Sequence, residues 1–181
     1  MKLVECVPNV SEGRDRKALD AIAAVISSVA GVRLLDIDPG AATNRTVFTF
    51  VGPIDAAAEA AFLAIRKAAE LIDMRNHKGA HPRMGATDVC PFVPLGDTTM
   101  GECVQVARGL GGRVGSELGI PVYYYEEAAT RPERRALSEI RRGEYEGLPA
   151  RLKDPAWSPG WFVASLTASR PHSLHRWVAP A

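Results

Sequence analysis

The sequence predicts an α+β domain of the ferredoxin-like type: a βαββαβ sandwich with an antiparallel or mixed sheet and its helices on one face. The predicted elements begin in the order strand, helix, strand, strand, helix, strand, which is the ferredoxin-like order. Apolar residues recur at helical spacing in some segments, whereas β-branched and aromatic residues fill others. The chain has 181 residues, 46% of them hydrophobic, which suits one compact domain with a sizeable core.

The first half of the chain supplies the opening elements of this order. Turn residues such as Pro and Gly separate them. The predicted elements are a strand over 2–8, a helix over 15–30 that Gly31 ends, strands over 32–38 and 45–52 that form a hairpin, and a helix that Pro53 opens.

The second half begins with a loop over 74–85 and completes the pattern. Pro91 and Pro94 indicate an interrupted or edge strand, because proline has no N–H for the sheet ladder. The predicted elements are a strand over 86–95, a helix over about 99–118 capped by Thr98 or Thr99, a strand over 121–126, and a short polar helix over 132–142.

Charge and cysteine content exclude several classes of protein. Lys plus Arg number 22 and Asp plus Glu 21, a balance that argues against electrostatic binding to nucleic acid or a membrane surface. The three cysteines are widely spaced and form neither a disulfide framework nor a CxxC zinc pair. With no signal peptide and no long apolar run, we expect a cytoplasmic protein.

The segment NHKGAHPRMGATD carries the richest chemistry. His77 and His81 lie four residues apart, but Gly79 and Pro82 disfavour the helix that a metal site would need, so no metal is expected. In a loop, His81 and Arg83 place an imidazole, which exchanges protons near neutral pH, beside a guanidinium, which pairs with carboxylates. A solvated loop histidine is the alternative.

The segment DIDPGAATNRT offers a second cluster. Asp36 and Asp38 alternate at a strand end, and the loop after them brings Asp38 near Asn44 and Arg45. The carboxylate of Asp38 could orient His81 or bind an amino group. Ordinary turn chemistry is the alternative, because Asp before Pro-Gly and Asn before a strand are common structural choices.

The segment VPNVSEGR lies between the first strand and the first helix, where ligand contacts are frequent. It contains Asn9, Ser11 and Glu12. Helix capping explains Ser11 equally well.

Several long motifs resemble the N-terminal subdomain of glutamate formimidoyltransferase, the transferase part of formimidoyltransferase-cyclodeaminase. The resemblance runs in register over about residues 3–159. The motifs are LVECVPNVSEGRD, LLDIDPGAATNRTVFTFVG, LIDMRNHKGAHPRMGATDVCPFVPL, ECV, PVYYYEEAA and RRGEYEGLP.

The resemblance implies a reaction of histidine degradation: transfer of a formimidoyl group from N-formimidoyl-glutamate to N5 of tetrahydrofolate, or of a formyl group in some relatives. It implies that His81 is the general base and that Asp38 orients the amine or His81. Tetrahydrofolate is then a co-substrate. The expected contacts to the substrates come from Asn9, Asn44, Arg45 and Arg83.

Two departures from the family bear on activity. A complete transferase carries a second, similar subdomain, and folate binds between the two, whereas these 181 residues match only the first. The family also continues after Trp-x-Pro with Asp-Phe-Gly-Pro and a glycine-rich, folate-contacting stretch, whereas GWFVASLTASRPHSLHRWVAPA follows Pro159 here. We therefore expect the subdomain over 1–159, a divergent tail over 160–181, and a homodimer or a partner chain that supplies the second subdomain. The alternative is a non-catalytic folate-binding or dimerising module.

Overall fold

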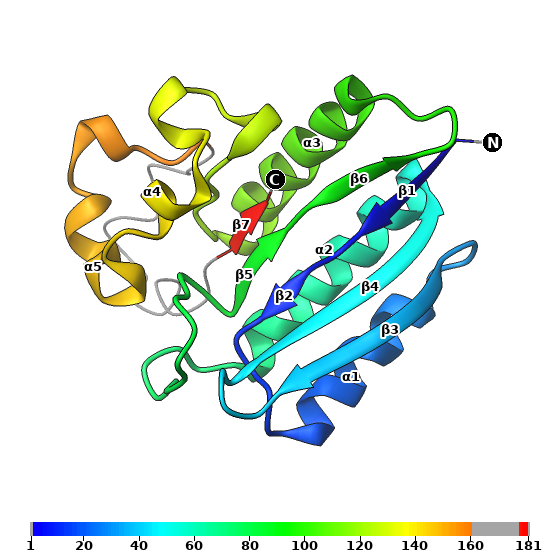
Figure 1. The fold of residues 1–181 in the computed structure, drawn as a ribbon, viewed down its shortest axis with the longest axis horizontal. Helices are drawn as coiled ribbons and strands as arrows, with labels where there is room; N and C mark the ends of the chain where they lie inside the picture. Colours follow the sequence, from blue (N-terminus) through cyan, green and yellow to red (C-terminus); the bar gives the residue numbers. More distant parts are fainter. Residues whose placement is uncertain (1, 161–177, 181) are drawn as a thin grey trace.

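An antiparallel sheet with three long helices behind it forms the fold (Figure 1). The computed structural model describes residues 2–160 and 178–180. It confirms the predicted α+β class, with an antiparallel sheet and helices. No helix in the described part of the chain is long and apolar enough to cross a membrane.

The sheet is built from the predicted strands in a non-sequential order. Across it run β3, β4, then β1 with β2, then β6 with β5, and last β7, which pairs with β5 in parallel. Their bounds are β1 Leu3–Cys6, β2 Asn9–Val10, β3 Arg33–Gly40, β4 Arg45–Pro53, β5 Thr87–Cys90, β6 Phe92–Leu95 and β7 Val178–Pro180.

A proline lies at each of two breaks in the sheet: the strand predicted over 86–95 is split into β5 and β6, and β2 follows the strand predicted over 2–8 in a segment where no strand is predicted. Pro8 lies between β1 and β2, and Pro91 lies between β5 and β6. Proline cannot donate to the ladder. The carbonyl of Pro91 still accepts a hydrogen bond from Val7 N at 3.1 Å, so the two interrupted strands stay adjacent. The interruption predicted at Pro91 is confirmed.

Two of the long helices begin at capping signals in the sequence. The side chain of Asp15 accepts hydrogen bonds from the first turn of α1, and Thr99 forms a capping box with Glu102 at α3. The helices are α1 Arg16–Ser27, α2 Ile54–Leu71, α3 Met100–Leu118, α4 Leu137–Arg141 and α5 Glu144–Arg151, with 3-10 turns η1 Glu126–Ala128, η2 Pro132–Arg134 and η3 Pro155–Trp157.

Helices cover one face of the sheet, and the other face is more exposed. Along β4, Phe48 and Phe50 are buried against the helices, whereas their neighbours Val47, Thr49 and Val51 point the other way and are half-buried. This period-two pattern is that of a strand with one face on the core. The open face is therefore available to support a site.

The strand predicted over 121–126 is wrong. Residues 121–125 are buried but form only an isolated bridge at Val122, and 3-10 turn η1 begins at Glu126. Tyr124 packs into the main core, while Tyr123 and Tyr125 pack into a second cluster with Ile140 and Leu148. The β-rich composition therefore reflects aromatic packing rather than pairing in a sheet.

The helix predicted over 132–142 is divided into η2 and α4. Helix α5 was not predicted, because Gly147 and Pro149 inside it disfavour a helix. In the expected tail over 160–181, the structure describes Gly160 and β7. The rest of that segment lies outside the described residues, so the domain boundary at 159 stays a prediction.

Candidate active site

Arg45 is the centre of a polar cluster at one end of the sheet. Its Nε donates to Oδ1 of Asn9 at 2.9 Å, and its Nη2 contacts the same oxygen. Its Nη1 lies 2.8 Å from Nδ1 of His81 and also contacts Nε2 of that ring. Three residues chosen from three separate motifs thus meet at one place.

The local structure explains why Asn9 and Arg45 meet. Asn9 is the first residue of β2 and lies opposite Val47, while Arg45 begins β4 two residues earlier. Side chains at Arg45 and Val47 leave β4 on the same, open face. Asn9 is buried, and its own Nδ2 donates to Val7 O at 2.8 Å, which leaves Oδ1 as the acceptor for Arg45.

The partners of His81 determine which ring nitrogen carries the proton. Nδ1 lies 2.6 Å from the carbonyl oxygen of Pro82, which can only accept a hydrogen bond. We therefore assign the proton to Nδ1, with the lone pair on Nε2, because a guanidinium such as Arg45 can only donate. An imidazole with its lone pair on Nε2 is the form that a general base requires, and here that nitrogen faces Nη1 of Arg45.

Burial and nearby charge act in opposite directions on Arg45. Burial lowers the pKa of its guanidinium, and the carboxylate of Asp88 partly opposes that effect. Nη1 of Arg45 lies 4.0 Å from Oδ2 of Asp88. Asp88 itself is buried at 1% exposure, and its Oδ1 accepts from Met84 N at 2.9 Å.

Asn44 joins two loops beside the cluster. Its Oδ1 accepts from Gly13 N at 2.9 Å, and its Nδ2 donates to Lys78 O at 3.1 Å. It adopts a left-handed conformation with φ of 50°, which Asn tolerates better than most residues. Both polar atoms of the Asn44 side chain are therefore used in hydrogen bonds to neighbouring loops of this chain.

Arg83 is held by two acidic side chains of α5. Its Nη1 donates to Glu144 at 2.7 Å, and its Nη2 donates to Glu146 at 2.7 Å. These carboxylates, Glu146 above all, raise the pKa of Arg83, and Arg83 lowers the pKa of Glu146 in return. Its Nε donates to Nδ1 of His77 at 3.2 Å, so this guanidinium is largely occupied within the chain.

Asp38 lies on the open face, across β4 from Asn9. In the register of the sheet, Asp38 is opposite Val47, which is opposite Asn9. Adjacent strands lie about 4.8 Å apart, so Asp38 and Asn9 are roughly 10 Å apart across β4. Its side chain is exposed and makes no hydrogen bond or ion pair with any other residue that the structure describes.

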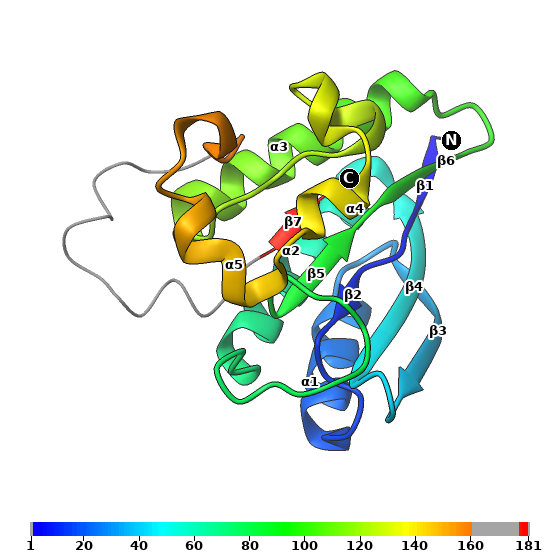
Figure 2. The ribbon, with the colours of Figure 1, turned by 60° about the vertical axis from the view of Figure 1, so that its left-hand side comes forward.

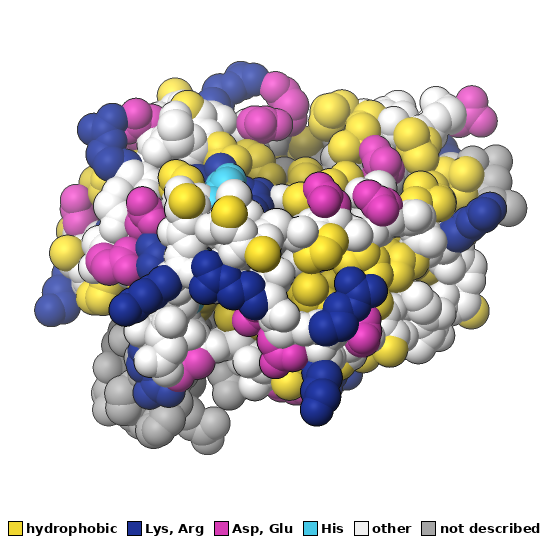
Figure 3. Space-filling model, turned by 60° about the horizontal axis from the view of Figure 1, so that its bottom comes forward, with side chains coloured by type: hydrophobic (Ala, Val, Ile, Leu, Met, Phe, Trp, Pro, Cys, Tyr) yellow, Lys and Arg dark blue, Asp and Glu magenta, His cyan; other side chains and the backbone are white. Residues whose placement is uncertain are grey.

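The two histidines do not form a metal site. Nε2 of His77 donates to Asn44 O at 2.9 Å, and its Nδ1 accepts from Arg83, so both ring nitrogens have protein partners. Among the described residues there is no group of three potential metal ligands. Figure 3 shows a histidine at the surface with Lys or Arg side chains beside it and hydrophobic side chains nearby.

Sequence reasoning did not select Asp88 or Arg141. Nη2 of Arg141, on α4, forms an ion pair with Oδ2 of Asp88, on β5. The available signal was a carboxylate within the strand TDVC, which is buried at every position. Such a carboxylate requires a charged partner, but the sequence does not say which arginine supplies it.

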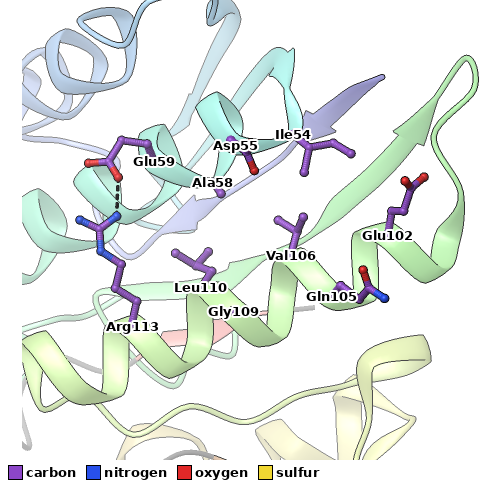
Figure 4. Close-up of a pocket in the computed structure, with 10 residues that line it drawn as sticks. All are labelled: Ile54, Asp55, Ala58, Glu59, Glu102, Gln105, Val106, Gly109, Leu110 and Arg113. Atoms are coloured by element: carbon purple, nitrogen blue, oxygen red, sulfur yellow. Dashed lines mark hydrogen bonds and ion pairs between the residues drawn. The ribbon is translucent and has the colours of Figure 1, made fainter. Parts of the chain in front are cut away.

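A groove of about 490 Å³ lies elsewhere, between α2 and α3 (Figure 4). Its floor includes Val106 and Leu110, and an ion pair between Glu59 and Arg113 spans one end. Helices α2 and α3 cover the core face of the sheet, whereas the side chain of Arg45 leaves the opposite face. This groove is separate from the His81 cluster.

Comparison with known proteins assigns the chain to a family. Residues 3–170 match the model of the formiminotransferase domain, N-terminal subdomain. The chain belongs to this family. The cluster of Asn9, Arg45 and His81 therefore lies on the open face of a formiminotransferase N-terminal subdomain.

Individual relatives agree with this assignment. The chain is 52% identical over 172 residues to formimidoyltransferase-cyclodeaminase of Dictyostelium discoideum, covering 93% of this chain and 32% of that protein. It is 56% identical over 158 residues to the Gallus gallus protein of the same name, covering 87% and 29%. It is 49% identical over 160 residues to glutamate formimidoyltransferase of Streptococcus pyogenes serotype M1, covering 88% and 54%. The formiminotransferase subdomain described here thus spans about a third to a half of the length of these relatives.

Proposed function

We propose that this chain is the N-terminal half of a folate-dependent formimidoyltransferase. It would transfer a formimidoyl group, or a formyl group, between glutamate and N5 of tetrahydrofolate, as in histidine degradation. The names of the relatives support the reaction class. The observation that carries the site assignment is the contact of Arg45 with both Asn9 and His81 on the open face of the sheet.

The reaction requires a proton to move between two nitrogens. N5 of tetrahydrofolate attacks the formimidoyl carbon, a new N–C bond forms, and a tetrahedral intermediate results. Nε2 of His81 accepts the proton that N5 loses. The bond from carbon to the glutamate nitrogen then breaks, and His81 returns the proton to that nitrogen, so glutamate leaves with its amino group and the imidazole is regenerated.

Arg45 gives His81 a defined orientation before substrate binds. Because Arg45 also contacts Nε2, the substrate must displace that contact before Nε2 can accept a proton. The released N–H groups of Arg45 are then available to a substrate carboxylate or pterin oxygen. Holding both substrates beside an oriented base contributes to the rate through proximity.

The other predicted residues receive distinct roles in this proposal. Asp38, exposed on the same face as Asn9, would bind or orient an amine of the substrates. Asn44 and Arg83 would contribute to the substrate site mainly by holding the loops around His81, although both remain candidates for direct contacts.

The open face would be completed by a second subdomain, carried by a partner chain or by a homodimer. The coverage of the relatives supports this, because the matched region ends well before they do. We place the protein in the cytoplasm. The fold is proposed to be ferredoxin-like, which the order β3, β4, β1/β2, β5/β6 supports.

Calorimetric titration with 5-formyltetrahydrofolate, with and without glutamate, tests binding by the purified chain. Turnover of N-formimidoyl-glutamate with tetrahydrofolate, with and without the second half of a relative, tests catalysis. His81→Gln is expected to lower kcat by about 10²- to 10⁴-fold while circular dichroism stays unchanged. Normal turnover in this variant would remove His81 from the role of base. Folate binding without any turnover would favour the non-catalytic module.

A further inference from the structure

Asp88 is a buried carboxylate that binds the backbone of the His81 loop and also lies near Arg45. Its Oδ1 accepts a hydrogen bond from the backbone N of Met84, three residues after His81, at 2.9 Å. Its Oδ2 lies 4.0 Å from Nη1 of Arg45, the guanidinium that contacts the His81 ring. One side chain therefore acts on the backbone of the loop and, through Arg45, on the imidazole.

A carboxylate at 1% exposure needs charged partners to remain ionised in the core. Arg141 supplies one, through an ion pair of its Nη2 with Oδ2 of Asp88. Arg141 comes from α4, at the start of the motif RRGEYEGLP, and has no role of its own in the proposed reaction. The Nε of Arg141 is buried and has no hydrogen-bond partner among the described residues. The guanidinium is therefore placed for its ion pair with Asp88, although this leaves one of its own N–H groups without an acceptor.

Arg45 makes two kinds of contact, which differ in distance. Its short contacts go to Asn9 and His81, whereas Asp88 stands at the length of an ion pair without a direct hydrogen bond. The carboxylate can thus hold the guanidinium by charge and leave its N–H groups directed at Asn9 and His81. The attraction acts in a region of low dielectric, where it is stronger than in water.

We propose that Asp88, held by Arg141, is a positioning residue that fixes Arg45 and thereby the ring orientation of His81. The catalytic consequence of this inference rests on the proposed function of His81. The positioning itself does not, and it can be measured in the chain without any substrate.

The test compares two variants with a matched control. Asp88→Asn keeps the shape and the acceptor for Met84 N but removes the charge. The pair Asp88→Asn with Arg141→Gln removes both charges of the ion pair together, which avoids leaving Arg141 as a cation without its carboxylate. The control makes the same change in the ion pair between α2 and α3, Glu59→Gln with Arg113→Gln (Figure 4).

The first readout is the ¹⁵N chemical shifts of the His81 ring, assigned by their loss in His81→Gln. The wild-type chain is expected to show two distinct ring nitrogens, protonated Nδ1 and unprotonated Nε2. In both Asp88 variants the two shifts should move toward each other, because a freed ring exchanges tautomers, while the control should keep the wild-type values. Wild-type shifts in the folded double variant would overturn the proposal.

The second readout is turnover by the complete enzyme. Both Asp88 variants should lower kcat by about tenfold to a hundredfold with KM little changed, since a misplaced base loses proximity. Arg141→Lys, which keeps the charge, should restore most of the rate relative to Arg141→Gln and provides a second measurement if the double variant fails to fold. Equal rates for Lys and Gln at this position would contradict the proposal. If His81→Gln proves fully active, the proposed function fails, whereas the ¹⁵N shifts still decide the positioning.

Discussion

Nη1 of Arg45 contacts the ring nitrogen Nε2 of His81, although the two residues are 36 positions apart in the chain. The sheet fixes Arg45 at the start of β4, and a loop without regular structure brings His81 to it. The contact therefore depends on the interactions that hold this loop against the rest of the domain.

Arg45→Lys should impair the site while preserving the fold. An ammonium group is a compact charge and cannot contact Asn9 and His81 in the geometry of the planar guanidinium fork. It still offers Asp88 a positive charge. We expect turnover of the complete enzyme to fall by about tenfold or more and the melting temperature to change little. Arg142→Lys, at an exposed position paired with Glu139, is the control, and equal rates in the two variants would contradict the role of Arg45.

Arg83→Met should loosen the attachment of α5 to the His81 loop. The variant loses the hydrogen bonds to Glu144 and Glu146, and we expect unfolding free energy to fall by about 1–2 kcal/mol, measured with urea. Arg142→Met removes a more exposed pair and should cost less than about 0.5 kcal/mol.

The same attachment should make stability depend on acidity. Arg83 lowers the pKa of Glu146 below its usual value, so this contribution is present above the ordinary carboxyl range and is lost as pH falls through the lowered pKa. Wild type and Arg83→Met should therefore converge in stability at acid pH. A constant difference down to pH 2 would show that packing, rather than charge, carries the effect.

Gly79→Ala should disturb the loop through a steric clash. A Cβ at this position would lie 2.1 Å from the carbonyl oxygen of Thr43 and 2.9 Å from Cβ of Asn44. We expect a loss of about 1–3 kcal/mol, measured by denaturant titration. Gly109→Ala, where a Cβ on helix α3 meets nothing within 4 Å, should instead stabilise the protein by up to about 1 kcal/mol. Similar effects at both positions would be inconsistent with this packing.

Alkaline pH should destabilise the second core cluster. Burial raises the pKa of Tyr123 to about 12, although Arg134 and Arg151 oppose the shift. The contribution is fully present below the ordinary tyrosine pKa near 10 and is lost as pH rises toward 12, about 3 kcal/mol in all. Tyr123→Phe cannot ionise, so its stability should decline less between pH 10 and 12 than that of wild type. At neutral pH this variant should be about 1 kcal/mol less stable, because the hydroxyl of Tyr123 donates to Trp157 O at 2.8 Å.

Capping residues and prolines in the sequence were sufficient to predict where several helices and strands begin or end. Asp15 and Thr99 cap the helices that their positions predicted, β1 ends before Pro8, and the break between β5 and β6 falls at Pro91. The signal failed where the tertiary environment dominates. The tyrosines of the segment 121–126 suggested a strand, yet they pack into two different cores without a partner strand.

The sequence by itself determined the α+β class, most elements before residue 120, and, through motif resemblance, the candidates His81, Arg45 and Asn9. Only the tertiary structure decided how these residues are connected. It paired Arg83 with the glutamates of α5, placed Asp38 across β4 from Asn9, and placed Asp88 between Arg45 and Arg141. The reason is physical: periodicity and capping act within a few residues, whereas the partner of a buried charge depends on which distant elements the fold brings together.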